Sequence, residues 1–245
     1  MATITTTTHS YNIPGLANTD IRVQIPILIL STVPSQCPFT PVPDIFNLRD
    51  LAHTSTPNIR PDLVYCSGGL NSLSDTSKAL LAKDLNIEGV SSVQLPCTAA
   101  LAAIDLKEFE RGDGRREYVR LYGEIMEIYR PSVRKVLEFL RDVHHEEGGR
   151  AGNDRTGILA AVIMGLAGCL NRAASRGASG HLDAIEEGWT VDTTGMVEFS
   201  QVKGSVMDAT MEMAEEKYGG MEGYMRDALG FSDQEIEQIR ANLRR

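Results

Sequence analysis

Apolar residues recur at helical spacing between Arg115 and Val143. The stretch is divided by Pro131, which lacks a backbone N–H and is tolerated in the first turn of a helix. The pattern therefore predicts two helices, with Pro131 in the first turn of the second. We expect the tyrosines of this stripe to be core residues rather than catalytic ones; the stripe consists of Tyr122, Met126, Tyr129, Val133, Val136, Leu137 and Leu140.

Three more helices are predicted from their ends and faces. One runs from Ser74, an N-cap residue, to about Leu85 and has Leu80, Leu81 and Leu85 on its apolar face. A second, 157–168, is apolar on all sides and is therefore expected to be buried. Near the C-terminus, Ser232 and Glu235 form a capping box for a last helix through Leu243, and Gly230 stands where the glycine after a helix belongs.

The N-terminal region is less regular. Residues 24–30 are too short to cross a membrane, and Pro26 favours an edge or loop element over a central strand. The threonine run 5–8 has the low complexity typical of a flexible start. We expect residues 1–40 to be a variable, partly flexible segment and residues 41–245 to form one domain.

Composition limits the class of protein. The formal net charge of −9 argues against broad binding to nucleic acid or anionic membranes, although one loop can still carry local positive charge. No apolar run approaches bilayer length, and the start lacks a basic region followed by an apolar core. We therefore expect a cytoplasmic chain with no transmembrane segment and no nucleic-acid partner.

Cysteine and histidine positions do not indicate a metal site. The cysteines, at positions 37, 66, 97 and 169, are widely spaced, and we expect them to be reduced, with Cys97 and Cys169 in structural roles. His144 and His145 lie beside two glutamates, and this composition is compatible with a metal site. A solvated helix end is favoured, because adjacent residues do not share a helix face.

The segment 151–157 carries the clearest chemistry. It is a small-residue turn that runs into the apolar stretch 158–164. The first N–H groups of a helix have no internal partner and lie at the positive end of its dipole, so they attract anions. Arg155 adds a planar fork of donors, and Gly152 and Gly157 allow close approach of the backbone. The segment predicts a site for a phosphate-like group.

This segment resembles the phosphate-binding loop of the tyrosine phosphatase superfamily, in the subgroup with the signature H-C-x-A-G-K-D-R-T-G. The chain reads GGRAGNDRTG, with Asn153 where Lys is usual. The resemblance implies that Arg155 clamps the phosphoryl oxygens, Asp154 donates a proton to the leaving group and Thr156 orients the loop. The backbone amides of residues 152–157 complete the cradle, which also involves Ala151, Gly152, Asn153 and Gly157. Such chemistry needs no metal and no organic cofactor.

The nucleophile of that signature is missing. In an ungapped alignment, the cysteine falls on Gly149 and the preceding histidine on Gly148. The family also places a buried parallel strand before the loop, whereas residues 144–150 are polar and glycine-rich. A simple account is that about half a dozen residues, containing the strand and the cysteine, are missing between Gly149 and Ala151.

Two other parts of the chain resemble the same family. Residues 46–51 and 59–70 are similar to F-N-x-R-D-L followed by R-P-G-x-x-Y-R-S-G-x-L, but Cys66 replaces the usual arginine, so a basic group near the site is lost. Residues 218–225 and 229–235 resemble the closing helices. The stretches 87–93 and 171–195 depart from the pattern: a second core strand is absent or shortened at the first, and a loop composition occupies the second.

Taken together, these features predict an α/β, tyrosine-phosphatase-like fold. We expect a central, mostly parallel and partly eroded sheet flanked by helices, with a helix-rich C-terminal half. Three functions remain open: hydrolysis of phosphotyrosine or a related phosphate monoester, binding of phosphorylated partners by a catalytically inactive pseudophosphatase, and an enzyme repurposed for a small anionic metabolite. The expected partner is a phosphorylated protein or a small phosphate-bearing ligand.

Overall fold

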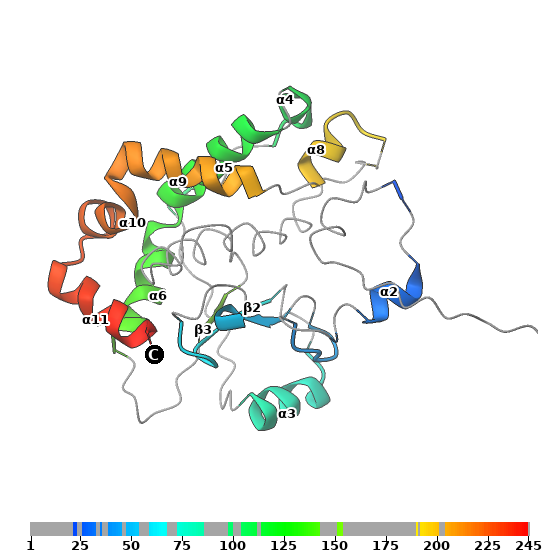
Figure 1. The fold of residues 1–245 in the computed structure, drawn as a ribbon, viewed down its shortest axis with the longest axis horizontal. Helices are drawn as coiled ribbons and strands as arrows, with labels where there is room; N and C mark the ends of the chain where they lie inside the picture. The colour runs from blue at the N-terminus through cyan, green and yellow to red at the C-terminus, as the bar shows by residue number, and fades with distance from the viewer. Residues whose placement is uncertain are drawn as a thin grey trace, which may run out of the picture.

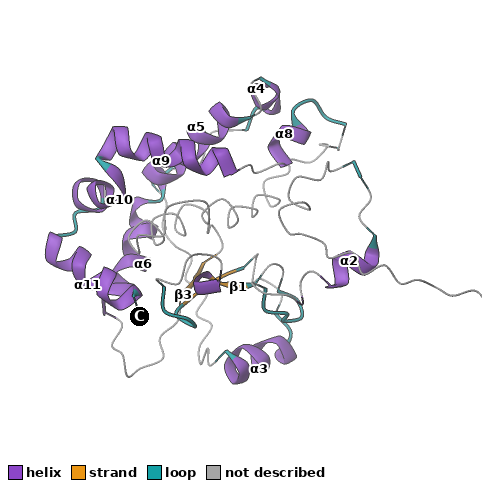
Figure 2. Ribbon diagram, in the orientation of Figure 1, coloured by secondary structure: helices purple, strands orange, loops and turns teal. Residues whose placement is uncertain are grey.

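The computed structural model of the chain is helix-rich with one small sheet (Figures 1 and 2). The structure describes residues 22–23, 26–32, 35, 39–45, 48–53, 59–67, 73–85, 98–99, 104–111, 114–142, 151–153, 190, 192–200 and 204–244. The helices in these ranges are α2 (Ile27–Thr32), η2 (Leu51–His53), α3 (Asp75–Asp84), α4 (Leu106–Glu110), α5 (Arg115–Ile128), α6 (Arg130–Asp142), α8 (Met196–Ser200), α9 (Gly204–Tyr218), α10 (Gly220–Gly223), the π-helix η5 (Tyr224–Ala228) and α11 (Asp233–Leu243).

The sheet has three strands in the order β1-β2-β3, namely β1 (Arg49–Asp50), β2 (Val64–Cys66) and β3 (Ala151–Asn153). The central strand β2 pairs antiparallel with β1 and parallel with β3. The described part of the chain is therefore an α/β arrangement, and one of its two strand pairings is parallel.

Strand β2 separates two hydrophobic clusters, because alternate side chains of a strand point to opposite faces of the sheet. Val64 and Cys66 belong to the main core, which includes residues of α5, α6, α9 and α11. Tyr65 belongs to a smaller cluster with Leu81 of α3. The sheet therefore lies between α3 on one face and the larger helical layer on the other, as Figure 1 shows.

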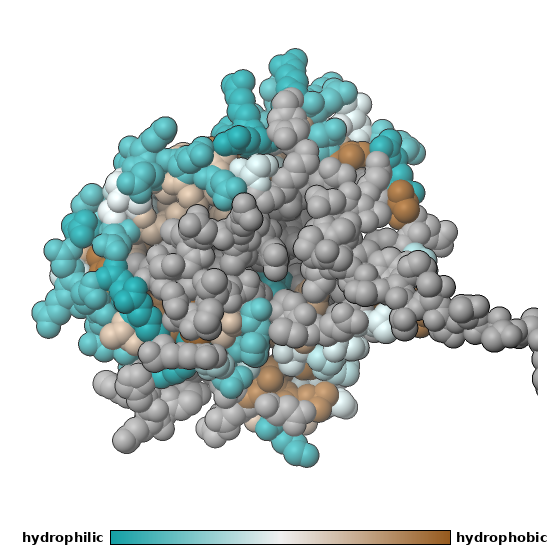
Figure 3. Space-filling model, viewed as in Figure 1, coloured by the Kyte–Doolittle hydropathy of each residue, from teal (hydrophilic) through white to brown (hydrophobic). Residues whose placement is uncertain are grey.

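The predicted stripe between Arg115 and Val143 is confirmed as two helices, α5 and α6, with Pro131 as the second residue of α6. Tyr122, Met126, Leu137 and Leu140 have no exposed surface, whereas Tyr129 and Val136 are only partly buried at the edge of the core. On the outside, the surface over α9, α10 and α11 is mostly hydrophilic (Figure 3). The helical layer is thus amphipathic, as the spacing predicts.

Helix α3 confirms the predicted N-cap. The Ser74 side chain accepts a hydrogen bond from the Ser77 backbone N–H at 3.2 Å, and the helix ends one residue before Leu85. Leu81 is buried, while Leu80 and Leu85 pack against the smaller cluster from partly exposed positions. The predicted apolar face therefore covers the Tyr65 side of the sheet.

The C-terminal helix also follows the prediction. Ser232 and Glu235 form the capping box, and α11 ends at Leu243. Gly230 has a φ of 73°, the left-handed conformation that glycine adopts without steric penalty, and so ends the preceding helix. Local sequence signals therefore set both ends of α11.

The prediction for residues 24–30 is wrong from Ile27 onward, because this segment forms the short helix α2. The carbonyl of Pro26 accepts the Ile29 N–H at 2.9 Å, so proline precedes the helix rather than interrupting a strand. Ile29 is buried, whereas Ile27 and Leu28 are 81% and 75% exposed. Within the described ranges, no helix has the length and apolar character that a membrane crossing requires.

Candidate functional site

Strand β3 consists of the first three residues of the predicted phosphate loop. Ala151, Gly152 and Asn153 pair in register with Val64, Tyr65 and Cys66 of β2, respectively. The expectation of a turn at these three positions is therefore wrong, because they are extended. In the described part of the chain, these three residues make the parallel pairing with β2.

The other predicted site residues, Asp154, Arg155, Thr156 and Gly157, lie outside the described residues, as do 144–150 and the buried helix predicted at 157–168. Their place in the chain is nevertheless informative. Asp154 directly follows Asn153, so it comes after the carboxyl end of a parallel strand pair. Ligands of open α/β sheets bind outside the carboxyl ends of the strands.

Arg49 lies in the same cross-strand row as the end of β3. In the sheet register, Arg49 is opposite Cys66, and Cys66 is opposite Asn153. Directly opposed residues share a face of a sheet, so Arg49 lies on the face that carries Cys66. Its side chain is buried, and this burial lowers the pKa of the guanidinium. The structure thus places a cation beside position 66, where the usual arginine is missing.

Cys66 is a free, buried cysteine at the carboxyl end of β2. Burial raises the pKa of its thiol to about 11, although Arg49 acts in the opposite direction. The thiol is therefore protonated at neutral pH, and a protonated thiol is a poor nucleophile. Cys66 does not supply the thiolate of the family signature, which aligns with position 149.

A second group of polar contacts surrounds Asp50. In the sheet, Asp50 lies opposite Tyr65, one residue pair further from the carboxyl end of β2. The Asp50 carboxylate accepts hydrogen bonds from the backbone N–H groups of Ala52 at 2.9 Å and Asp62 at 2.8 Å, and it lies 3.7 Å from His53 Nδ1. The Tyr65 hydroxyl donates to Asp62 at 2.6 Å. These contacts tie the turn after β1 to the turn before β2, which is a structural role.

Metal ligands do not cluster in the part of the chain that the structure describes: no group of three or more His, Cys, Asp or Glu side chains there is arranged to hold an ion. The run from His144 to Glu147, whose composition is compatible with a metal site, lies outside those residues.

A comparison against known protein families identifies the family of this chain. A family model described as "Tyrosine phosphatase family" matches residues 40–245, most of the chain. The chain belongs to the tyrosine phosphatase family. A search of curated proteins found no match to it.

Two features of this region were not evident from the sequence. The opposition of Arg49 and Cys66 depends on strand register, for which two-residue and three-residue strands provide little pattern. The second is Asn242, a buried residue near the end of α11 whose amide bonds to α6. An asparagine inside a helix carries no local signal of such a partner.

Proposed function

We propose that this member of the tyrosine phosphatase family binds phosphate monoesters, phosphotyrosine or a related ester, in the loop 151–157. The A-G-x-D-R-T-G string carries the proposal, since it lies within the family match and its first three residues form β3, which pairs in parallel with β2. In this proposal the sheet belongs to a larger, mostly parallel central sheet of the family type, and the chain is cytoplasmic.

In this proposal, each loop residue has its own role in binding. Arg155 holds two phosphoryl oxygens through its planar fork of donors, and the loop amides share the remaining negative charge. In this proposal Asp154 protonates the leaving group, and Thr156 orients the loop by hydrogen bonding. No metal or organic cofactor takes part in this scheme.

A second candidate, a pseudophosphatase, is favoured by Gly148 and Gly149, which stand where the family has histidine and the cysteine nucleophile. A glycine offers no side chain to attack phosphorus. Such a protein retains phosphoryl recognition and binds a phosphorylated partner without turnover. A third candidate keeps the pocket but acts on another small anionic metabolite by chemistry that does not use a thiolate.

Binding and turnover measurements separate these candidates. Calorimetric titration with phosphotyrosine and inorganic phosphate should show binding that Arg155→Ala weakens about tenfold or more, since a charge-assisted hydrogen bond is lost. Arg116→Ala, which removes an exposed arginine of α5, is the matched control and should bind as the wild type does. Equal affinities in the two variants contradict a phosphate site at Arg155.

Turnover of p-nitrophenyl phosphate is then followed with and without iodoacetamide. Binding without turnover supports the pseudophosphatase. Turnover that survives alkylation but is lost in Arg155→Ala supports a repurposed enzyme. Turnover that alkylation abolishes contradicts the absence of a cysteine nucleophile in this chain.

A further inference from the structure

Two consecutive residues at the end of α11 hold two chain segments that are far apart in sequence. The Asn242 amide nitrogen donates to the carbonyl of Leu140 at 2.9 Å and to that of Arg141 at 2.8 Å. The neighbouring Leu243 carbonyl accepts the backbone N–H of Arg60 at 2.8 Å. Asn242 is 3% exposed and Leu243 is fully buried, and the bond from Asn242 to the Leu140 carbonyl is buried.

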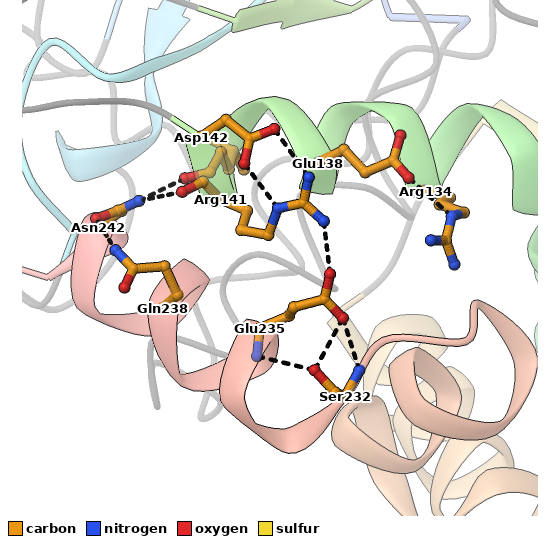
Figure 4. A network of polar contacts seen from close by, with 9 residues as sticks. Arg134, Glu138, Arg141, Asp142, Ser232, Glu235, Gln238 and Asn242 are labelled. Atoms are coloured by element: carbon orange, nitrogen blue, oxygen red, sulfur yellow. Dashed lines mark hydrogen bonds and ion pairs between the residues drawn. The ribbon is translucent and has the colours of Figure 1, made fainter.

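The contact to α6 is directed at the end of that helix. Leu140 and Arg141 lie in the last turn of α6, and the last carbonyls of a helix have no partner within the helix. The Asn242 amide supplies donors to two of them, and Gln238 Nε2 donates to Asn242 Oδ1 at 3.1 Å, which orients the amide. Figure 4 shows this group at the junction of the two helices.

A second contact between α11 and α6 lies two turns earlier on α11. Glu235, seven residues before Asn242, accepts a hydrogen bond from Arg141 Nη1 at 2.6 Å. Residues seven apart lie on nearly the same face of a helix, so α11 contacts the end of α6 at two points along one line. The end of α6 is thereby fixed in orientation as well as in distance.

Both held segments precede a strand of the parallel pair. Arg60 comes four residues before Val64, the first residue of β2, and α6 is the last described element before β3. β2 and β3 begin in register at Val64 and Ala151. The end of α11 therefore joins the segments that precede β2 and β3, and β3 forms the first three residues of the phosphate loop.

We propose that Asn242 and the Leu243 carbonyl form a clamp that sets the position of β2 relative to β3 and so positions the phosphate loop. Asn242 is a positioning residue in this scheme, since it acts through α6 and the sheet. The effect on phosphate binding rests on the proposed function, whereas the effect on the sheet does not.

Cys66 gives a direct readout of the sheet. It lies buried in the central strand β2, so alkylation requires local opening of the strand from the core. Its modification by iodoacetamide under native conditions is quantified by peptide mass spectrometry, which separates it from the other cysteines. Urea denaturation of the same samples gives the global stability.

The variants are Asn242→Asp, which replaces the donor amide by an acceptor of the same shape, and Asn242→Ala. Asp105→Ala is the matched control, since it removes the side-chain cap of α4 but leaves the contacts between α6 and α11 in place. The Asn242 variants should raise the Cys66 alkylation rate about tenfold beyond the increase expected from their global stability. In the control, the alkylation rate should rise only as much as its loss of global stability predicts. If one of these variants does not fold, Asn242→Ser, which keeps one hydrogen-bond donor, is measured in its place.

If the alkylation rate follows global stability equally in all variants, the proposed clamp is wrong. A phosphate affinity that is unchanged in the Asn242 variants overturns the positioning of the loop. If the wild type binds no phosphate, the proposed function fails, while the alkylation rates still decide whether the clamp holds the sheet.

Discussion

Arg141 of α6 and Glu235 of α11 form an ion pair with 2.6 Å between Nη1 and Oε1 (Figure 4). The same carboxylate accepts hydrogen bonds from the backbone N–H and the hydroxyl of Ser232, each at 2.9 Å. Arg141 also pairs with the adjacent Asp142 at 2.7 Å. One carboxylate therefore both caps α11 and joins that helix to α6.

This arrangement predicts acid sensitivity at Glu235. Hydrogen bonds from the backbone and side chain of Ser232, then from Arg141, lower the pKa of Glu235 below its ordinary value of 4.5. A carboxyl with a lowered folded-state pKa contributes its full stability above the unfolded-state pKa and loses it as pH falls through the folded-state pKa. Glu235→Gln should therefore lose less stability than the wild type on acidification below pH 4.5.

Urea denaturation at a series of pH values between neutrality and the acid limit measures this difference. Glu216→Gln, which replaces an exposed carboxylate of α9, is the control and should retain the wild-type acid profile. An identical acid profile for Glu235→Gln and the wild type would show that the capping carboxylate does not contribute.

The core of α6 gives a second prediction. Leu137 is fully buried, so Leu137→Ala should destabilise the fold by about 2–5 kcal/mol, through lost burial and the cavity left behind. Phe139, two residues away, is 41% exposed, and Phe139→Ala should cost about 1 kcal/mol or less. Chemical denaturation of both variants measures the difference. A larger loss for Phe139→Ala would place the core on the other face of α6.

The buried thiol of Cys66 predicts that the free energy of unfolding decreases at alkaline pH. Because burial raises its pKa from 9.0 to about 11, the folded state holds the proton more tightly than the unfolded state. Its contribution to stability is complete below pH 9.0 and is lost as the pH rises toward about 11. Denaturation of the wild type and Cys66→Ala across this range should show a steeper loss in the wild type. Parallel curves would contradict the raised pKa.

The opposition of Arg49 and Cys66 can be tested through the same thiol. The Arg49 guanidinium counteracts part of the effect of burial on the Cys66 pKa. Arg49→Met, which removes the charge but keeps a long side chain, should move the pH profile of Cys66 alkylation to higher pH. Arg49→Lys retains the charge and should shift the profile less. Equal shifts in the two variants would show that charge is not the reason.

Several features depend on neighbouring residues and were predictable for that reason. Ser74 caps α3, the Ser232–Glu235 box caps α11, and Pro131 falls in the first turn of α6, as their positions in sequence indicate. The 3.6-residue period correctly identified the faces of α5 and α6 that form the core. The A-G-x-D-R-T-G string and its flanking blocks likewise indicated the family that the comparison shows.

Contacts between distant segments had to be found in the tertiary structure. The strand at Ala151–Asn153 exists because β2 pairs with it, and its small residues carry no strand pattern of their own. The same holds for the register that sets Arg49 opposite Cys66, and for the amide of Asn242 at the end of α6. The sequence by itself determined helix ends, apolar faces and family, which follow from local hydrogen bonding and periodicity. The tertiary structure alone decided these pairings, because they arise between segments that meet only when the chain has folded.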